Sequence, residues 1–138
     1  MDLVIDANIV VSAFIRPGNK TSELIFSNRF DFFAPEFMIE EIVKHREEIV
    51  EKSGLSGDEL GLALSIISSR IKLIPFSEFR EFEKRASEIC PDPDDVEYFA
   101  LALQHRCALW SNDKRLKTQD VIKVMSTSEV LMLLENNL

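Results

Sequence analysis

The sequence predicts an α/β protein in which a parallel β-sheet carries helices on both of its faces. Short apolar, β-branched runs alternate with segments whose apolar residues recur at helical spacing, which is typical of this class. Glycine and proline are few, four and five in 138 residues, which disfavours disorder and all-β folds rich in turns. Hydrophobic residues make up 46% of the chain, enough for one core, so we expect residues 1–138 to form a single domain.

The first strand and helix are predicted at the start of the chain. Residues 2–6 form a short buried strand, because they are apolar and β-branched. Helical spacing follows over residues 9–15, until Pro17-Gly18 stops it. A second helix, residues 22–28, leads to a strand over residues 30–34 that a proline halts.

The middle of the chain is predicted to be mainly helical. Apolar spacing predicts one helix over about residues 36–52 and, after a glycine-containing break, another over about residues 56–67. Residues 71–74 form a third strand, which ends at a proline. Phenylalanines recurring at helical spacing then predict a helix over residues 76–89.

The last part of the chain returns to alternating elements. Residues 96–105 form a buried helix whose small alanines let it lie close to the sheet. Two further strands are predicted over residues 108–110 and 121–124. Ser126 and Glu129 have the spacing of a capping box, which predicts a last helix that runs through Leu134.

The overall charge is strongly acidic. The formal net charge is −8, which argues against a general nucleic-acid binder because phosphate backbones favour basic surfaces. A nuclease is not excluded, since bound metal ions would neutralise part of an acidic site. Cys90 and Cys107 are isolated, which favours a reduced, cytoplasmic protein. No apolar run is long enough for a transmembrane helix, and no signal peptide is visible, so we expect no membrane association.

The acidic residues that matter most fall at the ends of the predicted elements. Asp6 follows the first strand, Asp113 follows the strand over residues 108–110, and Asp92, Asp94 and Asp95 precede a helix. In a parallel α/β sheet, the carboxyl ends of strands and the amino ends of helices lie on the same side. We therefore expect these carboxylates to meet. Crowded carboxylates suit a hard divalent ion such as Mg²⁺ or Mn²⁺, and such a site favours metal-assisted cleavage of a phosphodiester.

Each acid also has a plainer interpretation. Asp6 can cap the helix that follows it, and Asp113 can belong to an ordinary polar turn. Acids before a helix complement its dipole, but three acids within four positions repel one another, which favours a functional role. Asp95, directly before the helix, is the best candidate among them. Glu40 and Glu41 lie beside an apolar stripe, so either one can point toward the sheet edge.

Four segments together resemble the motifs of one known family, the PIN domains. The segments are Leu3-Val4-Ile5-Asp6-Ala7-Asn8, Pro35-Glu36-Phe37-Met38-Ile39-Glu40-Glu41-Ile42, Asp92-Pro93-Asp94-Asp95 followed by Phe99-Ala100-Leu101-Ala102, and Trp110-Ser111-Asn112-Asp113-Lys114-Arg115-Leu116. Each motif is weak alone, but four of them in order at fitting spacings, between residues 2 and about 134, make a specific signal. The resemblance implies a Rossmann-like, three-layer α/β/α domain around a parallel sheet of about five strands.

The resemblance also implies roles for individual residues. Asp6, Asp95 and Asp113 match metal-binding aspartates, and Glu41 matches the acid of the second motif, with Glu40 as the alternative. The supporting positions are Asn8 and Ser111, which match polar residues that position the acids, and Asp92, which matches an additional acid of some members. The acidic net charge departs from many family toxins, which carry basic residues around the site. The candidates for phosphate contact here are Lys44, Lys114 and Arg115.

The expected function is therefore a Mg²⁺- or Mn²⁺-dependent endoribonuclease. The resemblance implies an RNA substrate, a homodimer and, if the protein is the toxin of a toxin–antitoxin pair, a small antitoxin partner. One alternative is a haloacid-dehalogenase-like phosphohydrolase, which also begins with a strand and an aspartate. That chemistry uses a second acid two residues later, where this chain has Asn8. Another alternative is a catalytically silent PIN-like binding or scaffold domain.

Overall fold

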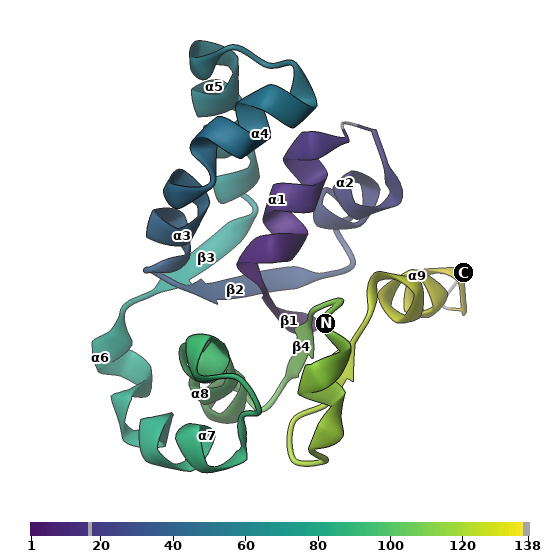
Figure 1. Ribbon diagram of the computed structural model, residues 1–138. Helices are drawn as coiled ribbons and strands as arrows, with labels where there is room; N and C mark the ends of the chain where they lie inside the picture. The colour runs from purple at the N-terminus through teal and green to yellow at the C-terminus, as the bar shows by residue number, and fades with distance from the viewer. Residues whose placement is uncertain (17, 137–138) are drawn as a thin grey trace.

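A five-stranded parallel sheet forms the middle layer of the protein, and helices cover both of its faces (Figure 1). The computed structural model describes residues 1–16 and 18–136. The strands lie in the order β3-β2-β1-β4-β5, and each neighbouring pair is parallel. Their bounds are Asp2–Ile5 (β1), Asp31–Pro35 (β2), Ile71–Ile74 (β3), Ala108–Trp110 (β4) and Val124–Met125 (β5). The predicted Rossmann-like, three-layer α/β/α architecture is therefore confirmed.

Strand β1 lies at the centre of the sheet and is buried on both faces. Leu3, Val4 and Ile5 are fully buried, as a parallel strand covered by helices on either side requires. Val4 pairs with Phe33 of β2, and Ile5 pairs with Trp110 of β4. The two halves of the sheet are therefore joined through β1.

One face of the sheet is covered by helices from the first half of the chain. Helix α1 contacts the other four helices of this group. The bounds of the group are Ala7–Ile15 (α1), Lys20–Ile25 (α2), Met38–Lys44 (α3), Arg46–Ser53 (α4) and Gly57–Ser68 (α5). The last helix, α9 (Thr127–Asn136), packs against α2 and β5.

The opposite face is covered by α8 (Val96–His105), which contacts β1, β2 and β4 (Figure 1). Ala100 and Ala102 are fully buried, and their small side chains let α8 lie close to the sheet, as predicted. Beside α8 lie α6 (Phe76–Phe79), the 3₁₀ turn η1 (Arg80–Phe82) and α7 (Glu83–Ile89). Two further 3₁₀ turns flank the sheet edge, η2 (Pro93–Asp95) before α8 and η3 (Lys114–Thr118) after β4.

The prediction of one helix over residues 36–52 is wrong, because the segment forms two helices. Helix α3 ends at Lys44, where the His45 N–H bonds the Ile42 carbonyl at 3.0 Å, a tighter turn than an α-helix makes. Helix α4 then begins with Glu47 and Glu48 in its first turn, where acidic residues favour a new helix start.

The position predicted for the fifth strand is also wrong. Strand β5 covers Val124–Met125, whereas the prediction placed it over residues 121–124. The side chain of Gln119 explains the difference. Its Oε1 accepts hydrogen bonds from the N–H groups of Val121 and Ile122, at 3.0 and 2.8 Å, and its Nε2 donates to the Ile122 carbonyl at 2.8 Å. The backbone here is therefore paired with a side chain instead of a strand.

The segment predicted as one helix over residues 76–89 contains a tighter 3₁₀ turn, η1, between α6 and α7. The Phe76 ring meets the buried Phe79 ring edge-on, with 5.4 Å between centroids. The Arg80 guanidinium lies 5.5 Å from the centroid of the Phe76 ring. These contacts hold the first turn as a unit separate from the helix that follows.

Side-chain caps explain two smaller shifts in helix starts. Helix α1 begins at Ala7, directly after Asp6, which lies at its N-cap. Helix α2 begins at Lys20, because the Asn19 side chain accepts a hydrogen bond from the Ser22 N–H at 2.9 Å.

Pro35 is the last residue of β2, whereas it was predicted to halt the strand one residue earlier. Its partner on β3 is Ile74, and the β1 pairing ends before this point, at Phe33. The missing N–H of the proline therefore leaves no gap in the ladder with β1.

The predicted stop after the first helix can be checked only in part. Pro17 lies outside the described residues, and Gly18 has a φ of +80°, a conformation that glycine favours. Across the described ranges, none of the helices has the length and apolar character needed to cross a membrane.

Candidate metal centre

The acidic site lies at the carboxyl edge of the sheet, where the strand order changes direction between β1 and β4. Asp6 follows β1 directly, and its N–H bonds the Trp110 carbonyl at 3.2 Å. Ser111 follows β4, and its N–H bonds the Met125 carbonyl at 3.0 Å. Crevices at such switch points are where open α/β sheets bind ligands.

Asp6 is both a helix cap and a member of this site. Its side chain is buried, and Oδ1 accepts a hydrogen bond from the Asn8 N–H at 2.7 Å. Its other oxygen, Oδ2, accepts from the Ser111 hydroxyl at 2.7 Å, and the Asp113 N–H donates to the same hydroxyl at 3.2 Å. Ser111 therefore links Asp6 to Asp113. Asn8 contributes its backbone, and its side chain is exposed.

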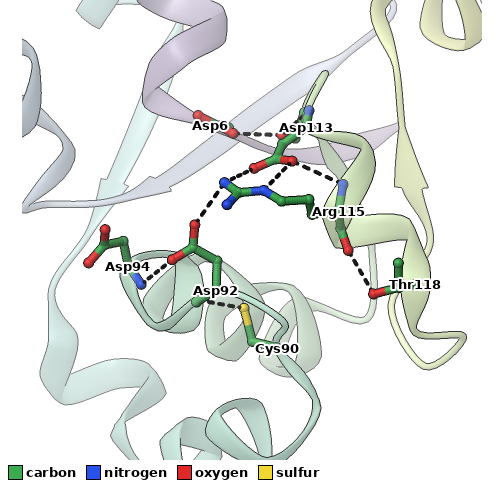
Figure 2. Close-up of polar contacts among 8 residues, drawn as sticks. Asp6, Cys90, Asp92, Asp94, Asp113, Arg115 and Thr118 are labelled. Atoms are coloured by element: carbon green, nitrogen blue, oxygen red, sulfur yellow. Dashed lines mark hydrogen bonds and ion pairs between the residues drawn. The ribbon is translucent and has the colours of Figure 1, made fainter.

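Three carboxylates form a close cluster beside Asp6. Asp92, Asp95 and Asp113 each offer a carboxylate oxygen, and these three atoms lie within 4.8 Å of one another. Asp92 caps η2, since its Oδ1 accepts from the Asp94 N–H at 3.0 Å, and its Oδ2 accepts from the Arg115 guanidinium that also binds Asp113 (Figure 2). Asp92, which sequence reasoning gave only a supporting place, is therefore a full member of the cluster.

Burial and the neighbouring negative charges together raise the pKa of Asp95 to about 7. Burial is the largest cause, followed by the negative charges of Asp6, Asp92, Asp113 and Glu41. The Asp95 carboxylate accepts no hydrogen bond from the described residues, so little offsets this repulsion. Burial also raises the pKa of Asp6, although its bonds to Ser111 and Asn8 act in the opposite direction. Carboxylates from both halves of the chain therefore lie close enough to raise the pKa of Asp95.

The second-motif acid that faces the site is Glu41. Its Oε1 accepts a hydrogen bond from the Tyr98 hydroxyl at 2.7 Å. Burial raises the pKa of Glu41, the Tyr98 hydroxyl lowers it, and the charge of Asp6 raises it further. Glu40 is exposed and makes no such contact within the described part of the chain.

Sequence reasoning missed Tyr98. It is buried on α8, and its ring packs against Phe37 with 5.4 Å between centroids. It is the one tyrosine of the chain and stands three residues after Asp95. The signal that could have identified Tyr98 as a site residue is its hydroxyl group, which stands in an otherwise apolar helical segment directly after the acidic motif.

The three basic residues predicted to contact RNA lie in different surroundings. Arg115 donates to both oxygens of Asp113, at 3.1 and 2.8 Å, and to Asp92 at 3.1 Å (Figure 2). Lys114 is exposed and contacts none of these carboxylates within the described ranges. Lys44 is also exposed, and its positive charge lowers the pKa of Glu41.

The chemistry of the donor set fits a hard divalent ion. All donors in the three-residue cluster are carboxylate oxygens, and histidine and cysteine take no part in it. Mg²⁺ and Mn²⁺ prefer such oxygen ligands, whereas structural zinc sites use sulfur and nitrogen. The nearby thiol of Cys90 donates to the Asp92 carbonyl, and burial raises its pKa to about 11, so it stays protonated.

Comparisons with known proteins agree with the fold. The family model described as "PIN domain" matches residues 4–135. Among solved structures, the chain is similar to one in the crystal structure of VapBC2 from Rickettsia felis bound to a DNA fragment from their promoter. That likeness has a TM-score of 0.64 at 16% sequence identity and covers 91% of this chain and 98% of the other, so it shows a common fold. No curated protein matches the sequence.

Proposed function

The chain belongs to the PIN domain family, and from that membership we propose that it is a metal-dependent nuclease that hydrolyses RNA phosphodiester bonds. The observation that carries the proposal is the cluster of Asp92, Asp95 and Asp113, linked through Ser111 to the buried Asp6. We propose further that residues 1–138 form one domain, which the family match across residues 4–135 supports.

The residues proposed to hold Mg²⁺ or Mn²⁺ are Asp6, Asp95 and Asp113, with Glu41 and Asp92 beside them. A divalent ion bound there supplies acidity to a water molecule and offsets the charge of the scissile phosphate. The chain's own contribution is to fix the acids in place. Ser111 orients the Asp6 carboxylate. Glu41 is oriented in the same way by the Tyr98 hydroxyl.

No side-chain nucleophile is required by this proposal. The two thiols of the chain support that reading, because burial raises the pKa of both Cys90 and Cys107 to about 11. A protonated thiol is a poor nucleophile near neutral pH. Attack by water, oriented among the carboxylates, is the chemistry that the site favours.

The proposed biological setting is the cytoplasmic toxin of a toxin–antitoxin pair, acting as a homodimer that a small antitoxin restrains. Family membership and the fold shared with a chain of the VapBC2 structure support this setting. Exposed apolar side chains are available for protein partners: Val43, Leu62 and Ile66 on α3 and α5 are 54%, 66% and 48% exposed.

The substitution Asp6→Asn tests the proposal. It keeps the side-chain size but removes the negative charge, so we expect cleavage of labelled single-stranded RNA with Mn²⁺ to fall by about 100-fold or more. The matched control is Asp31→Asn, which makes the same change at an exposed residue at the opposite, amino end of β2. This control is expected to keep wild-type activity.

Three results would contradict the proposal. Full RNA cleavage by Asp6→Asn would remove Asp6 from the catalytic machinery. Hydrolysis of a chromogenic phosphate monoester without any RNA cleavage would instead favour the haloacid-dehalogenase-like alternative. A protein that binds Mn²⁺ and cleaves neither substrate would be a catalytically silent PIN-like domain.

A further inference from the structure

Arg115 supplies a positive charge to the acidic cluster of Asp92, Asp95 and Asp113. It is the second residue of η3, and its guanidinium bridges Asp92 and Asp113 (Figure 2). Its Nε and one Nη donate to the two oxygens of Asp113, at 3.1 and 2.8 Å. The same Nη donates to Asp92 Oδ2 at 3.1 Å. One guanidinium therefore binds two of the three clustered carboxylates, in the fork geometry that arginine favours.

These hydrogen bonds occupy the oxygens that a divalent ion would use. Oδ1 and Oδ2 of Asp113 both accept from Arg115, and the Asp92 carboxylate is shared between Arg115 and the Asp94 N–H. Two cations at one small cluster also repel each other. A guanidinium in this position and a divalent ion held by Asp113 and Asp92 are therefore competitors for the same ligands.

Arg115 is held there loosely enough to be displaced. Its side chain is 72% exposed, and its ion pairs with Asp92 and Asp113 are the side-chain contacts that hold it. The guanidinium meets the two carboxylates from the solvent side, so it can move into solvent without disturbing the core. Its backbone N–H also bonds Asp113 Oδ1 at 3.0 Å and keeps that bond when the side chain moves.

We propose that Arg115 is a displaceable counter-ion, which neutralises Asp92 and Asp113 in the metal-free protein and competes with divalent metal for them. The inference rests on the proposed function, because it assumes that these carboxylates bind a divalent ion. It assigns Arg115 a role in regulating metal uptake, and metal binding then frees the guanidinium from the cluster.

Metal binding in the absence of RNA tests this role directly. Wild type, Arg115→Ala, Arg115→Lys and Lys114→Ala are stripped with EDTA, exchanged into chelator-free buffer and titrated with Mn²⁺, and the free ion is followed by its EPR signal. Lys114→Ala is the matched control, since it removes the same charge one position earlier from an exposed residue that lies outside the cluster's contacts.

We expect Arg115→Ala to bind Mn²⁺ about fivefold more tightly than wild type, and Lys114→Ala to stay within about twofold. The Mn²⁺ affinity of Arg115→Lys should lie between those of wild type and Arg115→Ala, because lysine keeps the charge but cannot form the two-pronged contact with Asp113. The difference in Mn²⁺ affinity between Arg115→Ala and wild type should become smaller in high salt, because salt screens exposed charges. Without metal, Arg115→Ala should also melt at a lower temperature than Lys114→Ala.

The outcomes separate this inference from the proposed function. If wild type binds Mn²⁺ and cleaves RNA but Arg115→Ala binds no more tightly than Lys114→Ala, only the counter-ion role fails. Weaker binding by Arg115→Ala would show instead that Arg115 positions Asp113 for the ion. Equal melting temperatures of Arg115→Ala and Lys114→Ala in EDTA would also contradict the counter-ion role of Arg115. If none of the proteins binds Mn²⁺, both proposals fall.

Discussion

Asp6 combines two roles that the sequence left as alternatives. One of its oxygens caps α1 through the Asn8 N–H, and the other accepts from Ser111 at the end of β4. A carboxylate has two oxygens, so helix capping and membership of the acidic site do not compete. The assignment of Asp6 as a metal ligand stays a prediction, which the Asp6→Asn experiment tests.

Tyr98→Phe tests how firmly Glu41 must be held. The substitution removes one hydroxyl and keeps the ring that packs on Phe37. Because partners of metal ligands orient them, we expect Mn²⁺ affinity to fall by about tenfold. The measurement is a Mn²⁺ titration, with urea unfolding in EDTA as a check that the fold persists. Unchanged affinity would show that Glu41 needs no such positioning, or lies outside the metal site.

The pKa of Asp95 predicts how the metal-free protein responds to pH. Folding raises this pKa from 3.8 to about 7, so the folded state holds the proton more tightly than the unfolded chain does. Asp95 therefore lowers the free energy of unfolding progressively as pH rises from about 4 to 7, and adds no further change above that window.

Asp95→Asn removes this titration. In EDTA, we expect the variant to gain stability relative to wild type as the pH rises from 4.5 to 7.5. This window covers the range in which the raised pKa of Asp95 makes the wild-type free energy of unfolding fall. Urea unfolding at the two pH values measures the change. Parallel pH profiles for the two proteins would mean that the folded cluster does not hold the Asp95 proton.

At the scale of elements, local signals predicted the ends that local contacts determine. The capping box forms as predicted: the Glu129 N–H donates to Ser126 Oγ at 3.3 Å, and Glu129 Oε1 accepts from the Ser126 N–H at 3.2 Å. Local sequence signals did not predict the helix break at His45 or the position of β5. Apolar periodicity continues across His45, and the loop before β5 is fixed by a glutamine that periodicity ignores.

Gln119→Ala tests the loop before β5. The Gln119 amide makes four hydrogen bonds, to Leu116, Val121 and Ile122, and alanine removes all of them. We expect the free energy of unfolding to fall by about 2 kcal/mol, since each net bond contributes about 0.5–1.5 kcal/mol and part of the loop is exposed.

The chain offers a matched control for this experiment. Gln104→Ala removes two contacts: Nε2 donates to the Glu78 carbonyl at 3.2 Å, and Oε1 lies 3.3 Å from His105 Nδ1. This variant should lose less than about 1 kcal/mol in urea unfolding. Equal losses for the two glutamines would show that Gln119 does not hold the loop.

At the scale of the whole molecule, topology predicted where the acids come together, and packing determined what else joins them. The expectation that Asp6, Asp95 and Asp113 lie near one another follows from the parallel order of the strands. The contacts of Tyr98 and Arg115 could not be predicted in this way. Tyr98 meets a residue 57 positions away and Arg115 meets one 23 positions away, and both contacts depend on how side chains pack between elements.

The same topology predicts that a divalent ion stabilises the entire fold. The carboxylates at the edge come from segments after β1, before α8 and after β4, so an ion that binds them ties these segments together. An ion that binds only the folded state adds about 2.7 kcal/mol at 100 times its Kd. For a protein of this size, we expect the melting temperature to rise by about 5–10 °C with Mn²⁺ and to return to its starting value with excess EDTA.

Variants decide whether that rise comes from the candidate site. Asp95→Asn should lose most of the shift, whereas Asp31→Asn, at the opposite end of the sheet, should keep it. An equal shift in both variants would place the stabilising ion elsewhere on the acidic surface. If wild type shows no shift at saturating Mn²⁺, the crowded carboxylates do not bind a divalent ion, and the metal-dependent nuclease proposal fails.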